Sequence, residues 1–148
     1  MSSPKSPVIA VYSDDSTVRQ SIVSSLGQKV ATDLPGHTIV EFATGAALHL
    51  YVDEKRPVDL FILDGEAVPE GGMGIARQLK DEVYHCPPVL LITGRPSDAW
   101  LATWSLADGV TSHPIDPFTL AGKVADLVVL ALVGGKHVFP VQRFDYVR

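Results

Sequence analysis

Apolar runs alternate along the chain with amphipathic segments of helical length. Runs of four to six mostly apolar residues, bounded by turn signals, are expected to be strands, and segments with apolar residues at helical spacing are expected to be helices. The expected strands are residues 8–11, 38–43, 60–63, 89–92 and 109–112, and the expected helices are residues 16–29, 46–55, 73–84, 97–107 and 117–133. Because strands and helices alternate, the pattern predicts an α/β fold with a parallel sheet.

Five strands that alternate with five helices favour a flavodoxin-like, doubly wound five-stranded parallel sheet with the strand order 2-1-3-4-5. Turn and cap signals support these boundaries. The sequence Asp116-Pro117 is typical of a helix start, with an N-cap residue followed by proline at the first helical position. We expect residues 1–135 to form one domain and residues 136–148 to form an extended C-terminal arm.

Composition narrows the class of protein. With 46% apolar and 20% charged residues over 148 positions, the chain is expected to be globular. The net charge of −5 argues against nucleic acid as a partner, because phosphate binding requires a basic face. The N-terminal segment lacks the apolar core of a signal peptide, and no run reaches the roughly 18 apolar residues of a membrane span. We therefore expect a cytoplasmic protein with no direct membrane insertion, which reaches a membrane only through a partner complex.

Polar side chains follow three of the predicted strands. Asp14 and Asp15 come shortly after the first strand, Asp64 ends the third and Thr93 ends the fourth. Because parallel strands end at the same edge of a sheet, we expect these side chains to meet. Carboxylate oxygens suit Mg²⁺, which keeps several waters in its octahedral shell. The pattern therefore predicts a site for magnesium and a phosphoryl group.

The order and spacing of these residues resemble the receiver domain of bacterial response regulators. The resemblance implies that Asp64 is the phosphoacceptor and that Thr93 contacts a phosphoryl oxygen. It also implies a weak magnesium site in which Asp15 and Asp64 bind the ion directly, Asp14 binds through water, and the backbone carbonyl of Glu66 supplies a further oxygen. Gly94 would leave room for the phosphoryl group.

Two positions depart from the family pattern. His113-Pro114 stands where receivers carry Lys-Pro, so His113 is expected to contact the phosphoryl group in place of a permanently charged lysine. Histidine has an ordinary pKa of about 6.5 and is mostly uncharged at neutral pH unless nearby carboxylates raise that value. Val110 stands where the family has a tyrosine or phenylalanine whose rotation reports phosphorylation. The resemblance therefore implies a retained site with a damaged switch.

Two of the acidic assignments have alternatives. Asp14 and Asp15 can instead cap the following helix, whose dipole favours negative charge at its start. The Glu66 side chain either approaches the phosphoryl group or points into solvent, and we expect solvent.

Several apolar residues are expected to contact a partner protein. The fifth helix is apolar nearly all round, and Trp100 and Trp104 share one face of the fourth helix. In receivers the fourth helix, fifth strand and fifth helix form the usual docking face. The alternative is a broad core stripe with scattered exposed apolar residues, which is normal in proteins. The residues expected at the interface are Trp100, Trp104, Val129, Leu132 and, from the arm, Phe139, Phe144 and Tyr146, although the arm can also fold back on its own domain.

Three functions are consistent with these features. Residues 63–66, 71–82 and 93–96 resemble most closely a group of orphan receivers from mycobacteria and other actinobacteria. That resemblance implies a degenerate stand-alone receiver that is a protein-binding accessory subunit rather than an enzyme, with the hydrophilic arm of respiratory NADH:quinone oxidoreductase (complex I) as partner. The alternative is a phosphorylatable regulator served by a histidine kinase. A hydrolase of the haloacid-dehalogenase kind is disfavoured, because Asp64-Gly65-Glu66 lacks the second aspartate.

Overall fold

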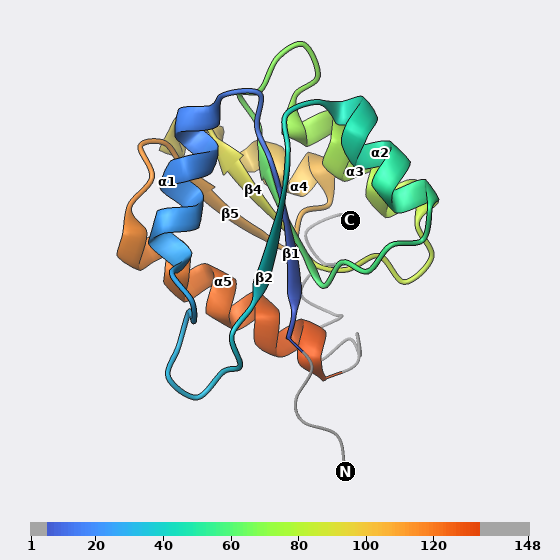
Figure 1. The fold of residues 1–148 in the computed structure, drawn as a ribbon. Helices are drawn as coiled ribbons and strands as arrows, with labels where there is room; N and C mark the ends of the chain where they lie inside the picture. The colour runs from blue at the N-terminus through green and yellow to red at the C-terminus, as the bar shows by residue number, and fades with distance from the viewer. Residues whose placement is uncertain (1–5, 134–148) are drawn as a thin grey trace.

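One parallel sheet organises the chain (Figure 1). The structure is a computed structural model, and it describes residues 6–133. Five strands pair in the order β2-β1-β3-β4-β5, which confirms the predicted fold class and strand order. The strands are β1 (Val8–Tyr12), β2 (Thr38–Phe42), β3 (Leu60–Asp64), β4 (Val89–Thr93) and β5 (Gly109–Ser112).

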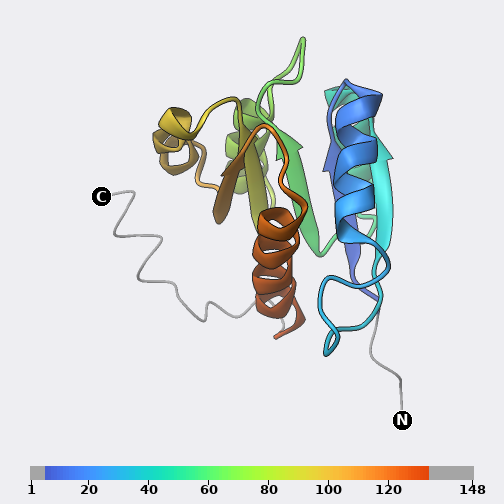
Figure 2. The ribbon, with the colours of Figure 1, turned by 90° about the vertical axis from the view of Figure 1, so that its left-hand side faces the viewer.

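Helices cover both faces of the sheet (Figure 2). They are α1 (Ser16–Leu26), α2 (Gly45–Asp53), α3 (Gly72–Glu82), α4 (Trp100–Ser105) and α5 (Pro117–Leu132), with a short 3₁₀ turn η1 (Pro96–Asp98) before α4. The buried side chains divide into two clusters, one containing residues of α1 and α5 and the other containing residues of α2, α3 and α4. The sheet is therefore the middle layer of three.

The central strand, β3, contributes side chains to the buried clusters on both faces of the sheet. All five residues of β3 are buried. Phe61 and Leu63 belong to the cluster beneath α2, α3 and α4, whereas Leu60 and Ile62 belong to the cluster beneath α1 and α5. Successive side chains of a strand point to opposite faces, so a continuous apolar run is what a strand with two covered faces requires. The polar side chain of Asp64 comes where this run ends.

Helix ends differ from the prediction by one to three residues in most helices, and most clearly in α1 and α4. Helix α1 stops at Leu26, not at residue 29, because Gly27 takes a left-handed backbone (φ 56°) and its N–H bonds to the carbonyl of Val23. The predicted fourth helix over residues 97–107 is η1 followed by only six residues of α4, and Leu106 ends it with φ 66°. The sheet positions agree more closely with the sequence than the helix ends do.

Helix α5 begins as predicted. Asp116 is its N-cap and accepts a hydrogen bond from the backbone N–H of Thr119 at 2.9 Å, and Pro117 opens the first turn. Hydrogen bonds from the side chain and backbone of Thr119 lower the pKa of Asp116. The buried face of α5 consists of Leu120, Val124, Leu127 and Val128, whereas Ala131 near its end is only half-buried.

Among the helices formed by residues 6–133, none combines the length and the apolar character needed to cross a bilayer.

Candidate functional site

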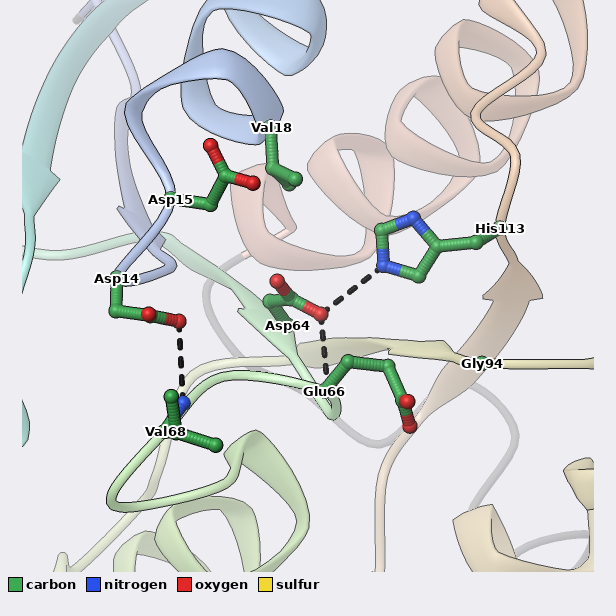
Figure 3. A pocket seen from close by; sticks show the side chains of 8 residues that line it. All are labelled: Asp14, Asp15, Val18, Asp64, Glu66, Val68, Gly94 and His113. Atoms are coloured by element: carbon green, nitrogen blue, oxygen red, sulfur yellow. Dashed lines mark hydrogen bonds and ion pairs between the residues drawn. The ribbon is translucent and has the colours of Figure 1, made fainter.

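A pocket lies at the carboxyl edge of the sheet, where β3 and β5 end and α1 begins (Figure 3). The predicted acidic residues and His113 line it, together with two valines that the sequence did not single out. The lining residues are Asp14, Asp15, Val18, Asp64, Glu66, Val68, Gly94 and His113.

Asp64 is the buried centre of the pocket, with 3% of its surface exposed. Its Oδ1 accepts a hydrogen bond from the backbone N–H of Glu66 at 2.9 Å and lies 3.0 Å from Nε2 of His113. Its Oδ2 accepts a hydrogen bond from the hydroxyl of Ser13 at 2.7 Å. Both carboxylate oxygens therefore have partners within the protein.

His113 takes the position beside Asp64 that the sequence predicted for it. The ring projects from the end of β5 into the pocket (Figure 3), and its backbone N–H donates to the carbonyl of Thr93 at 2.8 Å. An ionised carboxylate only accepts hydrogen bonds, so the imidazole donates through Nε2. Whether His113 also contacts a phosphoryl group stays a prediction.

Ser13 belongs to the site although the sequence did not identify it. Its side chain is fully buried, donates to Asp64 and accepts a hydrogen bond from the backbone N–H of Asp15 at 3.1 Å. The strand register explains the contact, because β1 pairs Tyr12 with Leu63 and so brings the next residues, Ser13 and Asp64, together. The pairing of the first strand with the third, extended by one residue beyond their ends, would have predicted this contact.

The two adjacent aspartates have separate tasks. Asp15 is the N-cap of α1, and its Oδ1 accepts a hydrogen bond from the backbone N–H of Thr17 at 2.8 Å. Asp14 instead reaches the loop after β3, where its Oδ1 accepts a hydrogen bond from the backbone N–H of Val68 at 3.1 Å. Asp15 therefore caps α1 as the alternative expected, and both aspartates line the pocket with Asp64.

Thr93 is buried at the end of β4, and it is not among the residues that line the pocket. Its Oγ1 lies 3.1 Å from the carbonyl oxygen of Arg95 and 3.3 Å from that of Thr111. The Thr93 hydroxyl is thus engaged with backbone carbonyls. Its predicted phosphoryl contact stays a prediction.

The Glu66 side chain is exposed, but it lines the pocket and lies against Gly94 (Figure 3). A Cβ atom at position 94 would come within 2.7 Å of the Glu66 side-chain Cδ. In this conformation the carboxylate fills the space that Gly94 was expected to leave for a phosphoryl group.

The pocket has a negative environment that extends to Tyr12. Burial raises the pKa of the Tyr12 hydroxyl, and the charges of Glu70, Asp14 and Asp64 raise it further. The hydroxyl donates a hydrogen bond to the backbone carbonyl of Glu70. Tyr12 therefore remains a neutral donor that ties β1 to the loop before α3.

The carboxylates offer limited room for a metal ion. Within residues 6–133, no three or more histidine, cysteine, aspartate or glutamate side chains are grouped so that they could hold one. Asp14 and Asp64 both line the pocket, and Mg²⁺ in proteins commonly takes one or two carboxylates and completes its shell with water. Magnesium binding by Asp14, Asp15, Asp64 and Glu66 stays a prediction.

The predicted interface residues of α4 and α5 are exposed. Trp100 and Trp104 expose 67% and 51% of their surface, and Val129 and Leu132 expose 48% and 42%. The guanidinium of Arg77 lies 5.6 Å from the ring centroid of Trp104 and donates to its backbone carbonyl at 2.8 Å. Binding through these side chains stays a prediction, and Phe139, Phe144 and Tyr146, with the arm over residues 136–148, lie outside the described residues.

Known proteins are similar to this chain in sequence or in fold. No family model matches the chain. An uncharacterized response regulatory protein of Mycobacterium tuberculosis, strain H37Rv, is 50% identical over 120 residues, which cover 81% of this chain and 90% of the relative. The corresponding protein of strain CDC 1551 gives the same identity and coverage.

Solved structures confirm the fold at low sequence identity. A CheY-like receiver domain protein of Methanospirillum hungatei has a TM-score of 0.69 at 16% identity, covering 86% of this chain and 97% of that one. Response regulator DrrB of Thermotoga maritima has a TM-score of 0.68 at 20% identity, covering 84% of this chain and 54% of DrrB. The M. tuberculosis relatives, with half of the aligned residues identical over most of both chains, show that this chain belongs to the response regulators, as a receiver domain.

Proposed function

We propose that this receiver is a protein-binding module that acts as an accessory or regulatory subunit of a larger complex. The observation that carries the proposal is the exposure of Trp100, Trp104, Val129 and Leu132, between 42% and 67%, on a single small domain. Isolated exposed apolar residues are ordinary, but tryptophan is enriched at the centres of protein interfaces. Two exposed tryptophans four positions apart on the six-residue helix α4 are more than the isolated exposed apolar residues that are ordinary.

The proposed partner is the hydrophilic arm of respiratory complex I, in line with the resemblance to mycobacterial orphan receivers. The protein would then be cytoplasmic and would reach the membrane only through that complex. Residues 136–148 would add a second contact through Phe139, Phe144 and Tyr146.

Co-purification from the native host tests this proposal. Leu132→Asp, the double substitution of Trp100 and Trp104 by alanine, and deletion of residues 136–148 should each release the receiver from complex I. A buried tryptophan anchor contributes about 2 kcal/mol or more, so its loss abolishes a modest interaction. Leu50→Asp is the matched control, because Leu50 is 59% exposed on α2 and outside the proposed surface.

Asp64→Ala should leave the complex intact. If Asp64→Ala alone lost the partner, phosphorylation would govern binding and the structural role would be wrong.

A phosphorylatable regulator is the second candidate, favoured by the position of Asp64 in the pocket at the end of β3. A carboxylate oxygen of Asp64 would attack phosphorus, forming the aspartyl O–P bond while the bond from phosphorus to the leaving group of the donor breaks. Magnesium held by Asp15 and Asp64, by Asp14 through water and by the Glu66 carbonyl would neutralise charge on the phosphoryl group. His113 would donate through Nε2, and Thr93 would donate after rotation of its hydroxyl.

Intact-mass measurement after incubation with acetyl phosphate tests the second candidate. The wild type should gain one phosphoryl group and Asp64→Asn should gain none. An equal mass gain in both proteins would refute Asp64 as the phosphoacceptor.

A further inference from the structure

The carboxylate of Asp64 is held by three donors that belong to the protein itself. Oδ1 receives the Glu66 backbone N–H at 2.9 Å and has His113 Nε2 at 3.0 Å, and Oδ2 receives the Ser13 hydroxyl at 2.7 Å (Figure 3 shows the two contacts of Oδ1). The donors come from three different places: the end of β1, the loop after β3 and the end of β5. Together they fix the carboxylate in position and orientation.

Each of these donors uses an oxygen lone pair that a metal ion would also use. A carboxylate has about four such sites, so three hydrogen bonds leave about one for a cation. The other aspartates of the pocket are also engaged, because Oδ1 of Asp15 caps α1 and Oδ1 of Asp14 accepts the backbone N–H of Val68. Fewer ligand charges and fewer available oxygens lower the affinity of a divalent-cation site.

Ser13 is the donor that most directly opposes a metal ion. Its side chain is completely buried, and its hydroxyl is the hydrogen-bond partner that the structure gives to Oδ2. We infer that Ser13 is a positioning residue that, with His113 and the Glu66 amide, keeps Asp64 ordered without a metal ion and keeps the magnesium affinity of the pocket low. The receiver would therefore hold its metal-free shape at magnesium concentrations that vary widely.

Thermal melts of the full chain in EDTA and across a magnesium chloride titration test this role. The wild-type melting temperature should change little between the two conditions. Ser13→Ala should melt roughly 3–8 °C lower in EDTA, because Oδ2 loses its buried hydrogen bond, and magnesium should restore part of that loss. Ser13→Asp should also melt lower in EDTA but bind magnesium about tenfold more tightly than the wild type, because it adds a carboxylate beside Oδ2.

Ser105→Ala is the matched control. Ser105 is also completely buried, and its hydroxyl donates to the carbonyl of Ala102 at 2.9 Å, within its own helix. This variant should lose stability without any recovery in magnesium. A wild-type melting temperature that rises with magnesium as much as that of Ser13→Asp would overturn the inference, as would Ser13→Ala with no recovery beyond the control. If Ser13→Asp does not fold, the comparison of the two alanine variants decides.

Discussion

Two aspartates at opposite edges of the same sheet are held in different ways. Asp64 lies at the carboxyl edge, with a serine hydroxyl, a histidine ring and a backbone N–H around it. Asp108 lies at the amino edge, just before β5, where its Oδ2 is 2.6 Å from the Nζ of Lys80 and 2.8 Å from the backbone N–H of Val89. Both carboxylates are nearly buried, but only Asp108 faces a permanently charged side chain.

The difference separates a structural contact from an adjustable one. An ammonium group only donates hydrogen bonds, so the roles of donor and acceptor are fixed in the pair of Lys80 and Asp108, which ties α3 to the start of β4 and β5. Serine hydroxyls and imidazole rings can either donate or accept, so the surroundings of Asp64 can adapt when its charge or its ligands change. A reaction or a bound ligand is therefore expected at the carboxyl edge, beside Asp64.

Removal of the lysine at the amino edge should have the largest effect on stability. Lys80→Met leaves the Asp108 carboxylate buried without its ammonium, and the side chains of Lys80 and Asp108 are only 7% and 10% exposed. Loss of one partner of a buried pair costs about 3–5 kcal/mol. Urea denaturation at neutral pH measures the loss.

Arg95→Met provides the control for that substitution. Arg95 lies 3.6 Å from Asp98, but its side chain is 77% exposed. An exposed ion pair contributes at most about 1 kcal/mol, so the control should lose little. An equally small loss in Lys80→Met would show that the amino edge does not depend on the fixed charge.

His113→Lys should give the carboxyl edge a permanent charge like the one at the amino edge. The ammonium can approach Asp64 Oδ1, which now lies 3.0 Å from the imidazole, and it reduces repulsion between Asp64 and Asp14. In EDTA the substitution should stabilise the protein by about 0.5 kcal/mol, the size of a partly exposed ion pair.

A double-mutant cycle with Asp64→Asn isolates this interaction. The gain should disappear when His113→Lys is made in the Asp64→Asn background. If His113→Lys destabilised the metal-free protein instead, the histidine would have a task at the carboxyl edge other than substituting for lysine.

The sheet and the location of the site follow from the sequence, because both depend on local patterns. Alternating apolar segments identified all five strands, and the position of Asp64 at the end of the third identified the pocket. Contacts between segments that are far apart in the sequence could not be predicted from it. Ser13 and Asp64 are 51 positions apart and Lys80 and Asp108 are 28 apart, so these pairs require the register of strands and the seating of α3.

The orientation of side chains within the site also could not be predicted from the sequence. Thr93 is expected to contact a phosphoryl oxygen, and in the structure its hydroxyl bonds the carbonyls of Arg95 and Thr111. Residue type and strand position determine where such a side chain starts, but a rotation about one bond decides what it contacts. The separate tasks of Asp14 and Asp15 likewise depend on where α1 begins.

A second histidine, His37, provides the smallest and most specific test, because its ring nitrogens are buried. His37 lies in the connection between α1 and β2, where both ring nitrogens are buried and neither has a well-formed hydrogen bond among residues 6–133. Burial lowers the pKa of the ring, and the nearby backbone of Gly27 offsets part of that shift. Below the ordinary histidine pKa of about 6.5 the unfolded chain binds a proton that the folded chain resists, so stability should fall as pH drops below that value.

Melting temperatures measured from pH 7.5 to 5.0 should decline less steeply in His37→Phe than in the wild type. His85→Phe, which alters an exposed ring that contacts Tyr84, is the control and should keep the wild-type slope. Equal slopes in the wild type and His37→Phe would mean that the ring takes up its proton in the folded state as readily as in the unfolded chain.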